Sequence, residues 1–291
     1  MGKSESKKAK IYYIFCYARS GGTLLNRFLS NVQDLVVLSE AHPVNFNRPN
    51  AGMMSIKEQA REWYGIDIIS ENYLDAIDEI SVWCEENKKS LVLRDWPYID
   101  FAKSNLNNFN PPRLPLNYKL LSLKYDLSAV AFIRDGIDVF LSSKHELNQF
   151  AQEYVDYVRY LKRLDVKFYK YEDFCNDYLS TYRNMAQVLG LPENNIKSSS
   201  MFQSDRVVGD VKYSRGNVFK EVKILKRRYS KLTFRRDIES NKDLLEANLT
   251  LGYEHKYGSR EIESENAYIV FKIKSFINRV SNVFGKVFDI R

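Results

Sequence analysis

The stretch "IYYIFCYARSGGTLLNRFL", residues 11–29, decides how this chain begins to fold. Its first part is a short apolar run rich in aromatic and β-branched residues, which predicts a buried strand. Gly21 and Gly22 then make a tight turn into a segment with helical spacing. A strand that leads through glycines into a helix is a common phosphate-binding arrangement, because the first N–H groups of the helix point at the anion. The stretch therefore predicts an anion-binding turn.

The chemistry of this turn differs from that of nucleoside-triphosphate loops. The signature G-x-x-x-x-G-K-[ST] is absent, and Arg19 stands where the turn begins. A planar guanidinium group suits tetrahedral oxyanions, and Ser20 and Thr23 add hydroxyl donors. Taken alone, these residues fit a glycine turn beside a surface arginine equally well.

Strand-like and helix-like segments alternate along the first 190 residues. Strands are predicted at 10–18, 35–40, 89–96, 128–135 and 164–173, helices at 23–32, 136–147 and 173–189, a region of helical spacing from about 55 to 88, and a loop at 105–117. This alternation implies right-handed crossovers and an α/β fold, with a mostly parallel central sheet flanked by helices. Beyond about residue 202 the strand signal fades. We therefore predict a basic tail (1–9), one α/β domain with a helical C-terminal extension (10–260) and a last amphipathic helix (261–291).

Several polar residues stand where the predicted strands end. They are Arg19, Glu40, Arg94, Arg134 and Tyr171. Ligands of parallel sheets bind beyond the carboxyl ends of the strands, so these residues are expected along one edge of the sheet.

A second anion site is indicated by Arg134 and Ser142. Ser142 follows eight residues later, about two turns into the predicted helix, so the pair would approach a phosphate from two directions. An ordinary turn and a helical serine are the alternative for this pair alone.

Three stretches taken together carry a family resemblance. "RSGGT" (19–23), "IRDGIDVFLSS" (133–143) and "FYKYEDF" (168–174), in this order and spacing, resemble the sulfotransferases that use 3′-phosphoadenosine 5′-phosphosulfate (PAPS). The resemblance covers roughly residues 10–220 and points to the bacterial and carbohydrate-type branch. It implies a P-loop-like fold and transfer of a sulfuryl group from PAPS to an acceptor hydroxyl.

The resemblance also implies a role for each matching residue. The 5′-phosphosulfate would be held by Arg19, Ser20, Gly21, Gly22 and Thr23, the 3′-phosphate by Arg134 and Ser142, and the adenine by Tyr171. Many members of the family carry a second threonine where Gly22 stands. Their late basic loop is matched only loosely by residues 207–219, where we assign cofactor binding to Arg215, with Lys212 in reserve.

The general base is not the histidine of the cytosolic branch. That branch ends its third strand with K-[TS]-H, whereas this chain has Arg94, Asp95 and Trp96. Glu40 stands 21 residues after Arg19, where bacterial and carbohydrate-type members place a catalytic glutamate. We predict that Glu40 is the base and that Arg19 and Arg94 stabilise developing charge, with Asp95 as the second candidate base.

Composition limits the partners. The chain has 44 Lys and Arg against 37 Asp and Glu, a net charge of +7, which favours an anionic partner. Its three cysteines are scattered without a C-x-x-C pair, which argues against a zinc site and fits a reducing compartment. The carboxylates show no metal-ligand spacing, and a phosphosulfate donor needs no bridging magnesium, so no metal is predicted.

Two basic segments in the C-terminal part of the chain each have more than one possible role. The stretch "YIVFKIKSFINRVSNVFGKVFDIR" (268–291) has an apolar stripe among basic residues. It would pack on its own domain or on a second subunit, or lie on an anionic membrane. The basic run "KILKRRYSKLTFRR" (223–236) is interpreted as a solvated helix face, with acidic glycan binding as the alternative. Without a signal peptide or a spanning segment, the expected location is cytoplasmic, or at the inner membrane surface.

Two other function classes compete with sulfuryl transfer. A P-loop-like kinase is disfavoured by the missing lysine and by a second phosphate site that ATP would leave empty. A non-catalytic protein that binds an anionic glycan is the other alternative, and no nucleic acid partner is predicted. The sequence leaves the acceptor open among glycans, lipids and small molecules.

Overall fold

The computed structural model describes residues 8–46, 54–103, 111–143, 145–191, 202, 206, 222–266 and 268–270. Within them, five strands form one sheet in the order β2-β3-β1-β4-β5, and every pair of neighbours is parallel. The strands are β1 (Lys10–Phe15), β2 (Leu35–Ala41), β3 (Ser90–Asp95), β4 (Asp126–Ile133) and β5 (Lys167–Lys170). This confirms the predicted α/β class with a parallel sheet.

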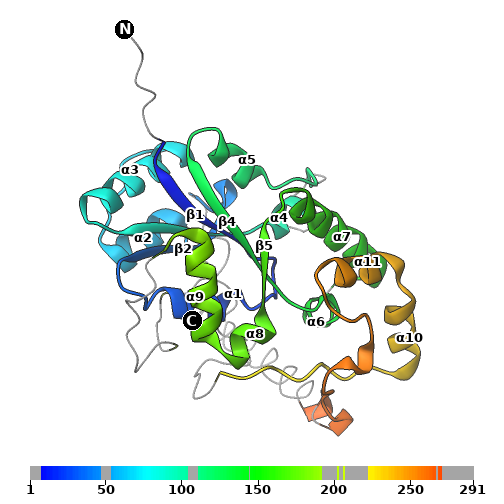
Figure 1. Ribbon diagram of the computed structural model, residues 1–291. Helices are drawn as coiled ribbons and strands as arrows, with labels where there is room; N and C mark the ends of the chain where they lie inside the picture. Colours follow the sequence, from blue (N-terminus) through cyan, green and yellow to red (C-terminus); the bar gives the residue numbers. More distant parts are fainter. Residues whose placement is uncertain are drawn as a thin grey trace, which may run out of the picture.

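Helices cover both faces of the sheet (Figure 1). One face packs against α1 (Gly22–Leu29), α8 (Tyr171–Asn176) and α9 (Tyr178–Leu189). The other packs against α2 (Ile56–Tyr64), α3 (Tyr73–Glu86), α4 (Tyr98–Phe101), α5 (Leu116–Ser122) and α7 (Leu147–Arg163). Because both faces are covered, the strands appear in the sequence as apolar runs rather than as alternating patterns.

The helical region 55–88 consists of two separate helices, α2 and α3, and three further predicted helix and loop boundaries are wrong. The predicted helix 136–147 is α6 (Gly136–Ser142), and α7 begins separately at Leu147 because the side chain of Glu146 caps its first N–H groups. The predicted helix 173–189 is divided into α8 and α9 at Asp177, which caps α9. The last two residues of the predicted loop 105–117 already belong to α5.

The outer strand β2 has its free backbone groups occupied by side chains from α2. The Tyr64 hydroxyl accepts from the Val37 N–H at 2.9 Å and donates to the Val37 carbonyl at 3.1 Å. Gln59 accepts from the Ser39 N–H at 2.7 Å and donates to the Ser39 carbonyl at 2.9 Å. The side chains of one helix therefore replace the missing neighbouring strand.

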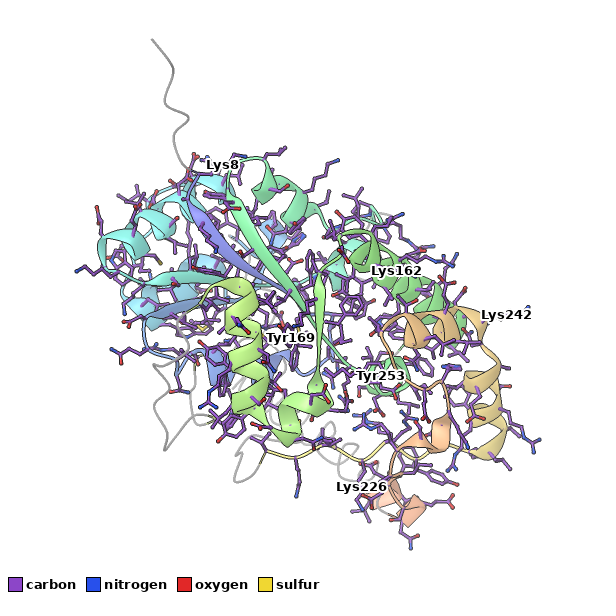
Figure 2. All side chains as sticks on the ribbon, viewed as in Figure 1. Lys8, Lys162, Tyr169, Lys226, Lys242 and Tyr253 are labelled. Atoms are coloured by element: carbon purple, nitrogen blue, oxygen red, sulfur yellow. The ribbon has the colours of Figure 1, made fainter. Side chains whose placement is uncertain are left out.

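The described part of the C-terminal extension contains both helices and irregular segments. It contains α10 (Leu232–Ser240) and α11 (Lys242–Thr250), and α11 packs against α7. The interpretation of residues 223–236 as a solvated helix face is wrong for its first half, which is extended. Lys226 lies at the surface (Figure 2), but the next residue, Arg227, is fully buried. No helix in the described ranges is long and apolar enough to cross a membrane.

Candidate active site

The turn after β1 has the geometry of an anion cradle. Gly21 has φ 95°, and a side chain there would collide with the ring of Tyr171. The N–H groups of Leu24 and Leu25 both bond the Gly21 carbonyl, at 3.0 and 3.2 Å. The preceding N–H groups, at the start of α1, therefore have no acceptor within the helix and are available to an anion.

Two buried polar atoms lie in this region without a hydrogen-bond partner among the described residues. One is the Ser20 hydroxyl and the other is Nε of Arg134. The Arg134 guanidinium lies 4.7 Å from the ring centre of Tyr171, and its Nη1 donates to the Arg19 carbonyl at 3.3 Å. Buried donors without partners are rare in proteins, so they suit a ligand rich in acceptor oxygens.

Arg94 occupies the space beside Gly22. The Arg94 side chain is 4% exposed, its Nη2 bonds the Ser39 hydroxyl, and its Nε lies 3.4 Å from Oδ1 of Asn26. A Cβ atom at Gly22 would lie 2.6 Å from Nη1 of Arg94. A side chain at this position would therefore collide with the guanidinium, which accounts for the glycine.

Glu40 lies on a β-bulge at the end of β2. Ser39 pairs with Arg94 and Ala41 pairs with Asp95, so Glu40 is the extra residue, and its φ is 51°. This left-handed conformation costs a non-glycine residue roughly 1–2 kcal/mol, and such irregularities often occur at functional sites. The bulge directs the carboxylate toward Arg94, with Oε1 3.6 Å from Nη2.

The environment of Glu40 affects its protonation. Burial raises the pKa of the Glu40 carboxyl above its ordinary value, and the neighbouring Arg94 opposes that rise. The side chain is still 16% exposed. A carboxylate with a raised pKa is a stronger proton acceptor than an ordinary glutamate.

Asp95 projects to the opposite face of the sheet. Successive residues of a strand point to opposite faces, so Arg94 faces α1, whereas Asp95 faces α5. Its Oδ1 accepts from Nδ2 of Asn117 at 3.0 Å, and its buried Oδ2 has no partner among the described residues. Arg94 therefore pairs with Glu40 and not with its chain neighbour Asp95.

The histidine nearest to Glu40 is used structurally. Nε2 of His42 lies 3.3 Å from Oδ1 of Asp100, and Nδ1 accepts from the Val44 N–H at 3.2 Å. With both nitrogens occupied and only 2% of the residue exposed, His42 holds the chain beyond β2.

Contacts thus join the predicted residues around one edge of the sheet, from Arg94 and Glu40 through the glycine turn to Arg134 and Tyr171. Thr23 lies in the first turn of α1 and Ser142 is the last residue of α6, both partly buried. Arg215 and Lys212 fall outside the described residues. No cluster of three or more metal-ligating side chains occurs in the described ranges.

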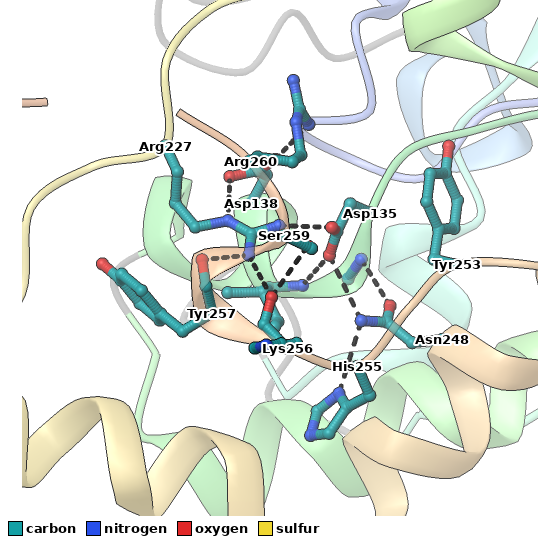
Figure 3. A network of polar contacts seen from close by, with 12 residues as sticks. Asp135, Asp138, Arg227, Asn248, Tyr253, His255, Lys256, Tyr257, Ser259 and Arg260 are labelled. Atoms are coloured by element: carbon teal, nitrogen blue, oxygen red, sulfur yellow. Dashed lines mark hydrogen bonds and ion pairs between the residues drawn. The ribbon is translucent and has the colours of Figure 1, made fainter. Parts of the chain in front are cut away.

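A buried charged network behind this edge escaped the sequence analysis. It consists of Asp135, Asp138, Arg227 and Arg260, which Figure 3 shows, together with Glu172, which pairs with Arg260. The sequence contains one indication of it, the aspartates Asp135 and Asp138 just after a predicted buried strand, which would need cationic partners if buried. Their partners, Arg227 and Arg260, lie about 90 or more residues away in the sequence.

Known proteins resemble the chain in structure rather than in sequence. No protein-family model and no curated protein matches the sequence. The sulfotransferase domain from the curacin biosynthetic pathway matches with a TM-score of 0.54 at 15% identity, covering 86% of this chain and 99% of that chain. The fold is that of a sulfotransferase domain. The domain from the olefin synthase of Synechococcus PCC 7002 gives a TM-score of 0.50 at 13% identity, covering 87% and 98%.

Proposed function

We propose that this protein transfers a sulfuryl group from PAPS to an acceptor hydroxyl and releases adenosine 3′,5′-bisphosphate. The observation that supports this most directly is the Glu40–Arg94 pair. In this pair a partly exposed carboxylate and a buried guanidinium lie beside an anion-binding turn on a sulfotransferase-like fold.

In this proposal the turn binds the phosphosulfate. The first N–H groups of α1, the Ser20 hydroxyl and Thr23 donate to its oxygens, and Arg19 adds positive charge. The side chains of Arg134 and Ser142 hold the 3′-phosphate. The ring of Tyr171, already in contact with Arg134, holds the adenine. Arg215 is proposed as a further donor.

The chemistry follows from the charges around Glu40. The carboxylate accepts the proton of the acceptor hydroxyl while the acceptor oxygen bonds to sulfur and the bond from sulfur to the phosphate oxygen breaks. Negative charge then develops on the departing phosphate, where Arg94 and Arg19 stabilise it. A positive group preorganised at such a position is typically worth about 3–4 kcal/mol.

Binding and transfer assays test this proposal. Adenosine 3′,5′-bisphosphate should raise the melting temperature more than ATP or heparin, because only it matches both phosphate sites. The protein should then move radiolabelled sulfate from PAPS to at least one member of a panel of sugars, phenols and lipid alcohols. Stronger stabilisation by ATP, with phosphate transfer, would support the kinase alternative. Stabilisation by heparin alone would support a non-catalytic glycan-binding protein.

A further inference from the structure

The charged network of Asp135, Asp138, Glu172, Arg227 and Arg260, termed here the C-terminal network, adjoins the proposed nucleotide site, because Asp135 follows Arg134 and Glu172 follows Tyr171 in the chain. Figure 3 shows the part of the network around Arg227. We propose that Arg227 and Arg260 are positioning residues that set the geometry of nucleotide binding. Each fixes the chain neighbour of a nucleotide-binding residue, Asp135 beside Arg134 and Glu172 beside Tyr171. This inference rests on the proposed function.

The first branch of the network fixes the end of β4. The fully buried Arg227 bonds Asp135 through Nη2 and donates from Nε to Oδ1 of Asp138 at 3.1 Å. Its Nη1 donates to the carbonyls of Lys256 and Tyr257 at 2.8 and 2.7 Å. All three guanidinium nitrogens are thus engaged, so Arg227 has a single available orientation.

Asp135 is held from further directions as well. Its Oδ1 caps α6 by accepting from the Ile137 N–H at 2.9 Å, and it lies 3.2 Å from Nδ2 of Asn248. The carbonyl of the preceding Arg134 accepts from the Tyr154 hydroxyl at 3.2 Å. The backbone from which the Arg134 side chain extends is therefore fixed by groups on α7, on α11 and in the C-terminal segment.

The second branch fixes the start of α8. Nη1 of Arg260 contacts both Asp138 and Glu172, so one guanidinium joins α6 to α8. The other oxygen of Glu172 accepts from the Tyr253 hydroxyl at 2.6 Å. Since Glu172 directly follows Tyr171, both contacts restrain the backbone of the proposed adenine-binding residue.

Stability alone does not account for such a network. Burying charges is costly, and apolar residues of similar volume often stabilise a protein as well or better. A fixed arrangement of forked hydrogen bonds instead gives orientation. Here the orientation is imposed on the two segments that carry Arg134 and Tyr171.

Ligands with and without a 3′-phosphate separate the two branches. Arg227→Lys keeps the charge but loses the fork, and acts beside Arg134. It should weaken binding of adenosine 3′,5′-bisphosphate by ~10-fold, the scale of a lost charged hydrogen bond, and binding of adenosine 5′-phosphate by less than about twofold. Arg260→Gln acts on Tyr171 through Glu172, so it should weaken binding of both nucleotides by a similar factor. Isothermal titration with the full-length protein gives each dissociation constant.

Arg159→Gln is the matched control, because its guanidinium bonds Glu246 on the surface between α7 and α11. It should leave both constants unchanged. Should Arg227→Lys fail to fold, Arg260→Gln, at a residue whose side chain is 14% exposed, still tests whether the second branch sets nucleotide affinity. Melting temperatures that fall while both constants stay at the parent values would overturn the inference alone. A parent protein that does not bind the bisphosphate would overturn the proposed function and this inference with it.

Discussion

Replacing Asp95 by asparagine removes a carboxyl group whose burial should be visible in the stability of the whole protein. Burial raises the pKa of Asp95 from 3.8 to about 6, the charge of Asp100 adds to the rise, and that of His42 opposes it. The folded state therefore binds this proton more tightly than the unfolded state. It follows that the contribution of Asp95 to stability is favourable at low pH and is lost as pH rises from about 4 to 6.

The size of the effect follows from the pKa difference. One pKa unit corresponds to about 1.4 kcal/mol, so the ionised Asp95 costs about 3 kcal/mol at pH 7.5 and about 1 kcal/mol at pH 4.5. Asparagine has nearly the same shape, keeps an oxygen that can accept from Asn117, and does not titrate. The margin in stability between Asp95→Asn and the parent protein should thus shift in favour of the variant by about 2 kcal/mol from pH 4.5 to pH 7.5.

Urea unfolding of both proteins at pH 4.5 and pH 7.5 measures this margin. Subtracting the parent from the variant at each pH removes the contributions of other titrating groups. A margin that stays constant with pH would refute the argument that Asp95 is a buried carboxyl with a raised pKa. Turnover is the second readout, and it should persist in Asp95→Asn because the proposed base, Glu40, lies on the other face of the sheet.

Three further substitutions test the site itself. Glu40→Gln should reduce turnover by roughly 10²–10⁴-fold with little change in nucleotide affinity. The rate of the parent protein should fall as the pH drops below the raised pKa of Glu40. Near-full turnover in Glu40→Gln, together with loss of turnover in Asp95→Asn, would show that Glu40 is not the base. Arg134→Ala should weaken binding of adenosine 3′,5′-bisphosphate by ~10-fold or more and binding of ATP much less. Equal losses of affinity for both nucleotides in titrations would contradict the assignment of Arg134 to the 3′-phosphate. Gly22→Thr should lower the melting temperature and turnover, since its Cβ would lie 2.6 Å from Nη1 of Arg94, and a variant equal to the parent would show that Arg94 is not held there.

The sheet and its carboxyl edge could be predicted from the sequence because buried parallel strands appear as apolar runs. The polar residues that follow these runs, such as Arg94 after "SLVL" and Arg134 after "AVAFI", then have to lie at one edge. Helix ends were less predictable. Glu146 ends one helical pattern and starts α7 by capping it, and a single glutamate is a weak signal in an otherwise helical stretch.

The bulge at Glu40 and the burial of Arg227 could not be predicted. "LVVLSEA" has no glycine or proline to mark a bulge, which is visible only in the register between β2 and β3. Arg227 stands in a strongly basic run, where solvent exposure is the natural expectation. It is buried because Asp135 and Asp138, which are distant in the sequence, pair with it in the folded protein. The residues around Arg227 in the sequence do not indicate these partners.

The hydrogen bonds from Tyr64 and Gln59 to the backbone of β2 also limit self-association through this strand. An open strand edge is a template on which another chain can add a strand, and many proteins protect it with charges or proline. Here the inward-turned side chains of one amphipathic helix take the same donors and acceptors, at Val37 and Ser39, that an incoming strand would need. Sheet extension from this side would require α2 to detach first, so the helix acts as a built-in guard against aggregation.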